Sequence, residues 1–280
     1  MKFGIIFGLL FLLVALESSG DEYDLYLLAG QSNMDGRGKL ENLSADQSRL
    51  FKNAIIYYRN PPKSTDGWKP LGPGYSIAPK YKGGLPSKTF GPELGFVATL
   101  SKARASGKFA LIKGSKGGTS LRVDWNPGEA GDPKTQGPRY QYLVETIELA
   151  MAALKEGGHT ATLRGLIWHQ GESDSKQSTE KHEIRLKKFV ARIREDLKAP
   201  KLPMVLGQVF DNGKRDNVRT AIRNVSKSDP LVGLVTAEGT TTWDAGTHFD
   251  ARSQLVLGER FAKEMLKLVG EPRNEEKLGQ

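Results

Sequence analysis

The sequence contains no cysteine and only four histidines among its 280 residues. The lack of cysteine excludes disulfide cross-links, thiolate catalysis and cysteine-ligated metal sites. It does not exclude an extracellular protein, because a chain of this length can bury a core large enough to dispense with disulfides. With so few metal-binding side chains, we expect no catalytic metal ion.

Long hydrophobic runs are also absent, with one exception near the N-terminus. Residues 4–16 form an apolar run that follows Lys2 and precedes several small residues. This order is typical of a secretory signal, and the run is shorter than the roughly 20 residues that span a bilayer. An uncleaved anchor is the alternative. We expect a signal peptide over 1–20 and a secreted or periplasmic protein over 21–280, without stable membrane insertion after cleavage.

No block of charge of one sign occurs, although the formal net charge is +9. Basic residues alternate with acidic ones along helical segments such as 181–198. This pattern is typical of a solvated helix face, whereas a groove that follows phosphates would be lined by one sign. We therefore predict no nucleic-acid partner. Internal repeats and low-complexity linkers are missing too, which favours one domain over 21–280 and a monomer.

The sequence does contain an alternation of short apolar runs and amphipathic helical segments. The apolar runs lie at 25–29, 109–112, 163–168, 204–210 and 231–236. The helical segments lie at 92–105, 142–156, 183–197, 216–225 and 252–269. Strands separated by helices pair in parallel. The prediction is therefore an α/β fold, a three-layer α/β/α sandwich with a central, mostly parallel sheet. Residues 60–90 show no periodicity and are predicted to form a long surface loop.

Polar and glycine residues follow the predicted strands. In parallel sheets, ligands bind at the carboxyl ends of the strands. The segments are GQSNM at 30–34, GSKGGTS at 114–120, WHQGESD at 168–174 and WDAGTHFD at 243–250. Each segment alone is explained by a turn or a helix cap. Their joint occurrence predicts one functional site at this edge of the sheet.

A serine and a histidine in these segments are candidates for acyl-transfer chemistry. Ser32 follows the first strand, where its backbone N–H would face a developing oxyanion. His248 lies close to carboxylates, as a Ser–His–acid relay requires. The other histidines are weaker candidates. We expect His159 and His182 to be exposed, and His169 to bind substrate or to support its loop.

These segments resemble the SGNH hydrolase superfamily, and within it the carbohydrate esterases that include acetylxylan esterases and sialate O-acetylesterases (carbohydrate esterase family 6 and its relatives). The resemblance rests on AGQSNMDGRG at 29–38, FGPELGF at 90–96, IKGSKGGTSL at 112–121, IWHQGESD at 167–174 and GTHFDARSQLVLGERFA at 246–262. It covers nearly the whole mature chain. It implies a flavodoxin-like α/β fold and a cofactor-free serine esterase that deacetylates a poly- or oligosaccharide of the acetylxylan type. A sialate or other sugar O-acetylesterase is the alternative.

The resemblance also implies roles for individual residues. Ser32 would be the nucleophile and His248 the general base. The backbone amides of Ser32 and Gly117 would form the oxyanion hole together with the side-chain amide of Gln170. Supporting or substrate-binding roles would fall to Gln31, Asn33, Gly118, His169 and Glu172.

The acid of the relay departs from the family's pattern. The family usually has an aspartate three residues before the histidine, where this chain has Ala245 and carries Asp244 one position earlier. A one-residue bulge would let Asp244 orient His248; otherwise Glu172 or Asp250 would have to do so. A carbohydrate-binding protein that has lost catalysis is therefore an alternative of another class.

Aromatic residues in two loops, 60–90 and 121–140, are candidates for sugar contact. They are Trp68, Tyr75, Trp125 and Tyr140. Stacking on a sugar and packing in the interior both remain open for these rings. A small acyl pocket predicts a strong preference for acetate, whereas a lipase-like esterase, the third alternative, predicts activity that grows with acyl-chain length.

Overall fold

A computed structural model describes residues 20–77 and 83–270. Its strands are β1 (Glu22–Gly30), β2 (Gly38–Lys39), β3 (Ala54–Asn60), β4 (Lys63–Ser64), β5 (Lys69–Pro70), β6 (Thr89–Phe90), β7 (Phe109–Ser115), β8 (Thr160–His169), β9 (Met204–Gly207) and β10 (Val232–Val235). Its α-helices are α1 (Ser32–Asp35), α2 (Glu93–Ala103), α3 (Pro138–Glu156), α4 (Thr179–Asp196), α5 (Asp216–Ser228) and α6 (Ala251–Val269).

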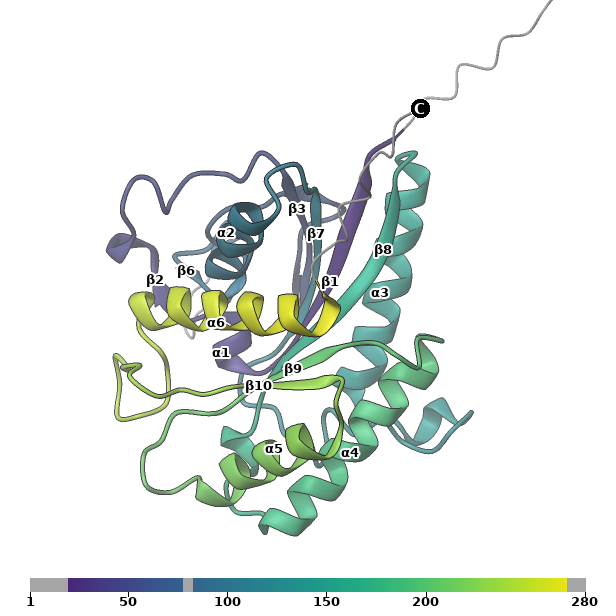
Figure 1. The fold of residues 1–280 in the computed structure, drawn as a ribbon, viewed down its shortest axis with the longest axis vertical. Coiled ribbons are helices and arrows are strands. Elements are labelled where there is room, and N and C mark those ends of the chain that lie inside the picture. Colours follow the sequence, from purple (N-terminus) through teal and green to yellow (C-terminus); the bar gives the residue numbers. More distant parts are fainter. Residues whose placement is uncertain (1–19, 78–82, 271–280) are drawn as a thin grey trace, which may run out of the picture.

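One twisted, eight-stranded sheet runs through the molecule (Figure 1). Its order is β10-β9-β8-β1-β7-β3-β4, and β5 also pairs with β3. The neighbours from β10 to β3 are parallel, while the two short strands β4 and β5 run antiparallel to β3. The predicted α/β class with a mostly parallel central sheet is therefore confirmed.

Helices cover both faces of the sheet, as the apolar stripes of their sequences require. On one face α2 packs against α6, and their apolar side chains, such as Phe96 and Phe261, form a core with the sheet. On the other face α3, α4 and α5 bury side chains such as Leu143, Phe189 and Val218 in a second core. The sheet is thus the middle of three layers (Figure 1).

The central strands end at the same level, which brings three of the polar segments together. Gly30, the last residue of β1, pairs with Ser115 of β7 on one side and with His169 of β8 on the other. Its φ is +143°, and a Cβ at this position would lie 2.2 Å from the His169 carbonyl oxygen. Glycine is therefore required where β1 turns into α1.

Several elements differ from the sequence-based expectation. The predicted strands and the five predicted helices are present, with bounds shifted by a few residues, but β3 and α1 were not predicted. The loop expected at 60–90 contains only the short strands β4, β5 and β6, and its residues 78–82 lie outside the described part. His182 is fully buried in α4 and not exposed, because it lies on the same buried face of the helix as Leu186 and Phe189.

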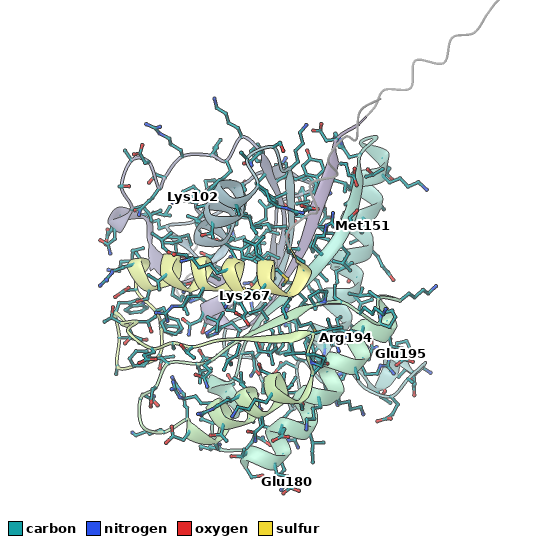
Figure 2. The ribbon with its side chains drawn as sticks, viewed as in Figure 1. Lys102, Met151, Glu180, Arg194, Glu195 and Lys267 are labelled. Atoms are coloured by element: carbon teal, nitrogen blue, oxygen red, sulfur yellow. The ribbon has the colours of Figure 1, made fainter. Side chains whose placement is uncertain are left out.

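Residues 1–19 of the predicted signal peptide also lie outside the described residues. Among residues 20–77 and 83–270, no helix is both long and apolar enough to cross a bilayer. Charged side chains such as Lys102, Glu180 and Lys267 project from the outer faces of their helices into solvent (Figure 2).

Candidate active site

Ser32 is the first residue of α1, directly beyond the carboxyl end of β1. Its residue surface is only 4% exposed, and it lines a cavity of about 610 Å³. The cavity lies where the loops that follow β1, β7 and β8 meet the segment before α6. This is the edge of the sheet at which the sequence predicted a site.

Ser32, His248 and Asp244 form a continuous hydrogen-bonded series. The Ser32 Oγ lies 3.2 Å from His248 Nε2, and His248 Nδ1 lies 2.6 Å from Asp244 Oδ2. The imidazole therefore contacts a hydroxyl through one nitrogen and a carboxylate through the other. With the proton on Nδ1, Nε2 is free to accept the proton of Ser32.

Asp244 is held by its own loop. Its Oδ1 accepts the backbone N–H groups of Thr247 and His248, at 2.9 and 2.8 Å. Burial raises the pKa of Asp244, but these two hydrogen bonds and the contact with the imidazole outweigh it, so the net pKa is lower than usual. The loop accommodates the extra residue between aspartate and histidine, and Asp244 is the carboxylate that faces the ring.

The two other carboxylates considered for this role are engaged elsewhere. Glu172 Oε1 accepts a 2.6 Å hydrogen bond from the Asn33 side chain. Asp250 accepts the Ser253 N–H at the start of α6 and the Thr241 hydroxyl. Neither carboxylate has a hydrogen bond or an ion pair with His248 among the described residues.

Asn33, the residue after Ser32, connects α1 to the loop that carries His248. Its Nδ2 donates to Glu172 Oε1 and, at 2.8 Å, to the Thr247 carbonyl oxygen. Its Oδ1 accepts the Phe249 N–H at 3.1 Å. Asn33 therefore fixes the peptides on both sides of His248, and Glu172 holds Asn33 in place. The supporting roles that the family resemblance implied for Asn33 and Glu172 stay predictions, and these contacts are consistent with them.

Two of the three expected oxyanion donors are suitably placed. Within the described residues, the backbone N–H groups of Ser32 and Gly117 have no hydrogen-bond partner. A Cβ on Gly117 would lie 3.4 Å from the Ser32 Cβ, so the two residues are adjacent. Both line the cavity. Their N–H groups are thus available to an oxygen bound beside Ser32.

The third expected donor, Gln170, lies elsewhere, and this corrects the sequence-based assignment. Its side chain is fully buried and is not part of the cavity wall. Its Nε2 lies 2.6 Å from Asp174 Oδ2 and also within reach of the Thr119 carbonyl and Gln31 Oε1. These acceptors occupy the amide, so Gln170 braces the loops behind the site.

The remaining expected residues divide between the cavity and its support. Gln31 lines the cavity, and its Oε1 accepts the Gly171 and Ser173 N–H groups. Gly118 lines it too, with a φ of +75°. His169 is 1% exposed, and burial lowers its pKa, so it is a neutral ring packed edge-on against Phe249. It supports the loop and does not reach a substrate.

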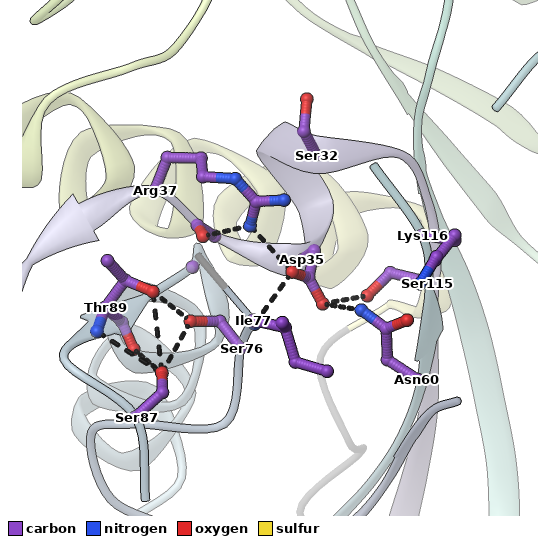
Figure 3. A network of polar contacts seen from close by, with 12 residues as sticks. Ser32, Asp35, Arg37, Asn60, Ser76, Ile77, Ser87, Thr89, Ser115 and Lys116 are labelled. Atoms are coloured by element: carbon purple, nitrogen blue, oxygen red, sulfur yellow. Dashed lines mark hydrogen bonds and ion pairs between the residues drawn. The ribbon is translucent and has the colours of Figure 1, made fainter. Parts of the chain in front are cut away.

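A buried carboxylate below Ser32 was missed by the sequence reasoning. Asp35, at the end of α1, is fully buried and accepts five hydrogen bonds, of which Figure 3 shows those from Arg37, Asn60, Ile77 and Ser115. The donors are Arg37 Nη1 (2.6 Å), Tyr58 Oη (2.8 Å), Asn60 Nδ2 (2.9 Å), the Ile77 N–H (3.0 Å) and Ser115 Oγ (3.1 Å). Burial, followed by the Asp35 charge, raises the pKa of Tyr58 well above its usual value, which keeps this donor protonated. Asp35 thereby joins α1 to β3 and β7.

Cationic side chains line the cavity and were also missed. They are Arg37, Lys116 and Arg215, against a single carboxylate, Glu172, among the described lining residues. Arg215 donates to the Gly246 carbonyl and the Thr247 hydroxyl, and so clamps the histidine loop. Burial lowers the pKa of Lys116 from its usual value of 10.5. The clustering of these residues depends on tertiary contacts, and no sequence spacing signals it.

The aromatic residues considered for sugar stacking pack in the protein. Trp125 and Tyr140 are core residues, Trp68 donates its indole N–H to the Ala150 carbonyl, and Tyr75 donates to the Pro70 carbonyl. The exposed aromatic ring near the site is Trp243, which is 49% exposed. It stacks on His248 with ring centroids 5.6 Å apart and planes at 14°. Its sequence position next to Asp244 was the available signal.

The described residues contain no cluster of three or more His, Asp or Glu side chains that could hold a metal ion. The arrangement is that of an α/β protein with a serine, a histidine and an aspartate in hydrogen-bonding sequence beside two free backbone N–H groups. This geometry is suited to acyl transfer.

Comparison with known proteins places the chain in a family. Residues 22–267 match the family model described as "Carbohydrate esterase, sialic acid-specific acetylesterase". The chain belongs to this carbohydrate esterase family. It is 24% identical over 268 residues to the probable carbohydrate esterase At4g34215 of Arabidopsis thaliana, covering 86% of this chain and 90% of that protein.

Solved structures share the fold. The crystal structure of the Arabidopsis thaliana protein At4g34215 has a TM-score of 0.71 at 21% identity, over 90% of this chain and 100% of that one. NanS has a TM-score of 0.63 at 17% identity, over 89% and 98% of the two chains. A carbohydrate acetylesterase from Xanthomonas citri has a TM-score of 0.61 at 16% identity, over 88% of this chain and 56% of that one.

Proposed function

We propose that this protein is a secreted serine esterase that hydrolyses O-acetyl groups on carbohydrate, with Ser32 as nucleophile, His248 as general base and Asp244 as the orienting acid. The observation that carries the proposal is the pair of contacts at His248, 3.2 Å to Ser32 Oγ and 2.6 Å to Asp244 Oδ2. Membership of a carbohydrate esterase family supplies the class of substrate.

The reaction proceeds in two acyl-transfer steps. Ser32 Oγ forms a bond to the acetyl carbonyl carbon as its proton passes to His248 Nε2, and the carbonyl π electrons move onto the oxygen. The N–H groups of Ser32 and Gly117 stabilise this oxyanion. The bond to the sugar oxygen then breaks, and His248 returns the proton to the departing hydroxyl. Water activated by His248 releases acetate by the same route.

A working enzyme is favoured over a binding protein that has lost catalysis. That alternative depended on the aspartate being one position out of the family's pattern. The backbone N–H groups of Thr247 and His248 donate to Asp244 Oδ1, and in this loop conformation Oδ2 still contacts the imidazole. The reason for expecting a missing acid is therefore gone.

Among sugars, the charge of the cavity favours an acidic one, such as an O-acetylated sialic acid, over neutral acetylxylan. Lys116 and Arg215 line the cavity, and neither forms an ion pair within the described residues. Their positive potential attracts a carboxylate-bearing substrate and does little for a neutral xylan. The wording of the matched family model points to the same sugar.

The test is acetate release by the protein over 21–280 and by its Ser32→Ala variant. The substrates are O-acetylated sialic acid, acetylated xylan and p-nitrophenyl acetate. We expect the parent protein to release acetate from sugar substrates that enter the cavity, and fastest from O-acetylated sialic acid. In Ser32→Ala the rate of acetate release should fall by about 10⁴-fold or more. Ser101→Ala, which alters a hydroxyl of α2 that contacts Asn53, is the matched control.

Equal release by the parent protein and Ser32→Ala would refute the serine mechanism. Activity on p-nitrophenyl acetate without release from any sugar would refute the carbohydrate substrate. Higher kcat/KM on acetylated xylan than on O-acetylated sialic acid would leave the esterase in place and exclude the acidic-sugar preference.

A further inference from the structure

The oxyanion hole of the proposed mechanism has two backbone donors, and Gln170 is not available as a third because its amide is bonded to Asp174 behind the site. A third donor to the oxyanion would therefore have to come from another residue of the cavity wall. Arg37 is 5% exposed and lines the same cavity as Ser32 and Gly117.

The guanidinium of Arg37 is fixed from one side. Its Nη1 donates to Asp35 Oδ2 and to the Gly36 carbonyl oxygen, both at 2.6 Å. Asp35 is in turn held by four further donors from α1's surroundings. A buried arginine anchored in this way cannot follow a ligand by changing rotamer, so the direction of its other N–H groups is preset.

The other terminal nitrogen, Nη2, lies beside Gly117, a residue of the cavity wall. It has no hydrogen-bond partner within residues 20–77 and 83–270. A Cβ built on Gly117 would lie 2.8 Å from Arg37 Nη2 and 3.4 Å from Ser32 Cβ. Nη2 and the Cβ that carries the Ser32 hydroxyl therefore border one point, the Cβ position of Gly117. Figure 3 shows the guanidinium between Ser32 and Asp35.

We infer that Arg37 Nη2 is the third donor to the oxyanion, in the role that the sequence assigned to Gln170. As Ser32 Oγ bonds to the acetyl carbon, the carbonyl oxygen gains negative charge and accepts N–H groups from Ser32, Gly117 and Arg37. A guanidinium cannot give up its proton near neutral pH, so it stabilises this charge without being consumed. The inference rests on the proposed function, because it takes Ser32 as the nucleophile.

The absence of a side chain on Gly117 follows from the same geometry. A methyl group here would occupy the point that Nη2 borders and would displace the end of the arginine side chain. The Gly117→Ala variant keeps its own backbone N–H and both charges of the Asp35–Arg37 pair. It thus perturbs the position of the third donor while leaving the buried ion pair in place.

The experiment compares steady-state kinetics of the parent protein with Arg37→Gln, Arg37→Lys and Gly117→Ala. The main substrate is p-nitrophenyl acetate, which has the acyl group and no sugar. We expect Arg37→Gln to lower kcat by about 10²–10³-fold with little change in KM. Gly117→Ala and Arg37→Lys should lower kcat by a smaller factor. In a fourth variant, Arg37→Ala, added methylguanidinium should restore part of the activity, whereas it should restore none to Ser32→Ala.

Two matched controls separate this role from a structural one. Arg192→Gln removes another buried arginine that is paired with an aspartate, Asp196 at 2.9 Å, far from Ser32 in the α4 helix. Gly114→Ala adds a methyl group that meets a Leu143 methyl at 3.1 Å. Both should retain kcat. Circular dichroism and urea unfolding check each fold, and if Arg37→Gln fails to fold, Gly117→Ala and Arg37→Lys carry the test.

Retention of kcat on p-nitrophenyl acetate in folded Arg37→Gln would overturn the inference. So would a rise in KM confined to sugar substrates, which would make Arg37 a sugar-binding residue. An inactive parent protein is a different outcome, since it would refute the proposed function and not the placement of Arg37 alone.

Discussion

Two aspartates flank Ser32, and they are held in opposite ways. Asp244 receives its hydrogen bonds from residues 247 and 248, within one short loop, and its side chain is 25% exposed. Asp35 is fully buried and receives its hydrogen bonds from residues as far away as Ser115. Asp244 contacts the His248 imidazole from a turn that the local sequence encodes. Asp35 ties together strands that only the complete fold brings near.

The comparison predicts that neutralising Asp244 lowers activity, whereas neutralising Asp35 lowers stability. Asp244→Asn should lower kcat by about 10⁴-fold, as loss of the orienting acid does in serine proteases, because the imidazole loses its tautomer and its counter-charge. Its unfolding midpoint in urea should change little. Glu172→Gln is the control carboxylate at the cavity, and it should retain far more activity. Comparable losses in both variants would remove the distinction between relay and support.

Asp35→Asn should instead destabilise the protein by about 3–5 kcal/mol, because it leaves the buried Arg37 guanidinium without its counter-charge. Urea unfolding monitored by circular dichroism measures this. Asp196→Asn is a matched control because it neutralises one of the two carboxylates paired with the buried Arg192. Asp196 is 20% exposed and Glu195 remains as a partner, so the loss of stability should be smaller. Equal stability of Asp35→Asn and the parent protein would show that the buried network contributes nothing to folding.

This contrast also explains how far the sequence could be interpreted. The strands β1, β7, β8, β9 and β10 and the long helices follow from apolar runs and helical periods, and so does the position of Ser32 at a strand end. The Asp244–His248 pair is local, so its spacing is visible in the chain. Strand β3, which lies between β7 and the short strands β4 and β5, was not predicted, and neither was α1, because its four residues carry no helical period.

The orientation of Gln170 and the position of Arg37 could not be predicted. Both depend on carboxylates that the fold supplies. Asp174 is only four residues from Gln170, yet its role as the acceptor requires the loop to fold back on itself. Arg37 follows Asp35 closely in sequence, but only the closing of β3 and β7 around Asp35 buries the pair. A motif identifies residue types, whereas the direction of a donor follows from tertiary packing.

Lowering the pH should reduce the stability of the protein first through the buried His182, and only at lower pH through Asp244. Burial lowers the pKa of His182, and the opposing Asp174 charge does not offset this, while nearby Arg185 adds to it. Below pH about 6.5 the unfolded chain therefore binds a proton that the folded chain does not. Stability should fall with decreasing pH by up to about 1.4 kcal/mol per pH unit for this group. The lowered pKa of Asp244 keeps that carboxylate ionised throughout this range, and its stabilising hydrogen bonds are lost only below its ordinary pKa of 3.8.

Urea unfolding of the parent protein and His182→Leu at pH 7.5 and 5.5 measures this effect. His182→Leu should show the weaker pH dependence, because it lacks one of the buried neutral rings. His169, whose pKa burial also lowers, remains as a second contributor in both proteins. An identical pH dependence in the variant would show that His182 does not titrate on unfolding in this range.

The smallest effect concerns the exposed side of the relay. Trp243 stacks on His248, so its ring should stabilise the imidazolium that forms during acyl transfer by about 0.5–1 kcal/mol. Loss of this stabilisation in Trp243→Ala should lower kcat about 2–5-fold. Trp243→Phe, which keeps an aromatic ring, should have a kcat close to that of the parent protein. The assay is turnover of p-nitrophenyl acetate across pH 5–9. An unaltered kcat in Trp243→Ala would show that the indole does not stabilise the His248 imidazolium.

The hydrogen bonds of Asn33 have a consequence for when the site forms during synthesis and folding. They join a residue that follows the first strand to Thr247 and Phe249, more than 200 residues later, just before α6. A chain still being synthesised already contains Ser32, but it lacks Asp244 and His248 until its last part has been made. The three side chains therefore cannot come together early in synthesis. Esterase activity should therefore return among the last signals during refolding, after the circular dichroism of the sheet and helices has recovered. The proposed esterase should therefore be inactive during synthesis, until residues 32–249 have been made and have folded together.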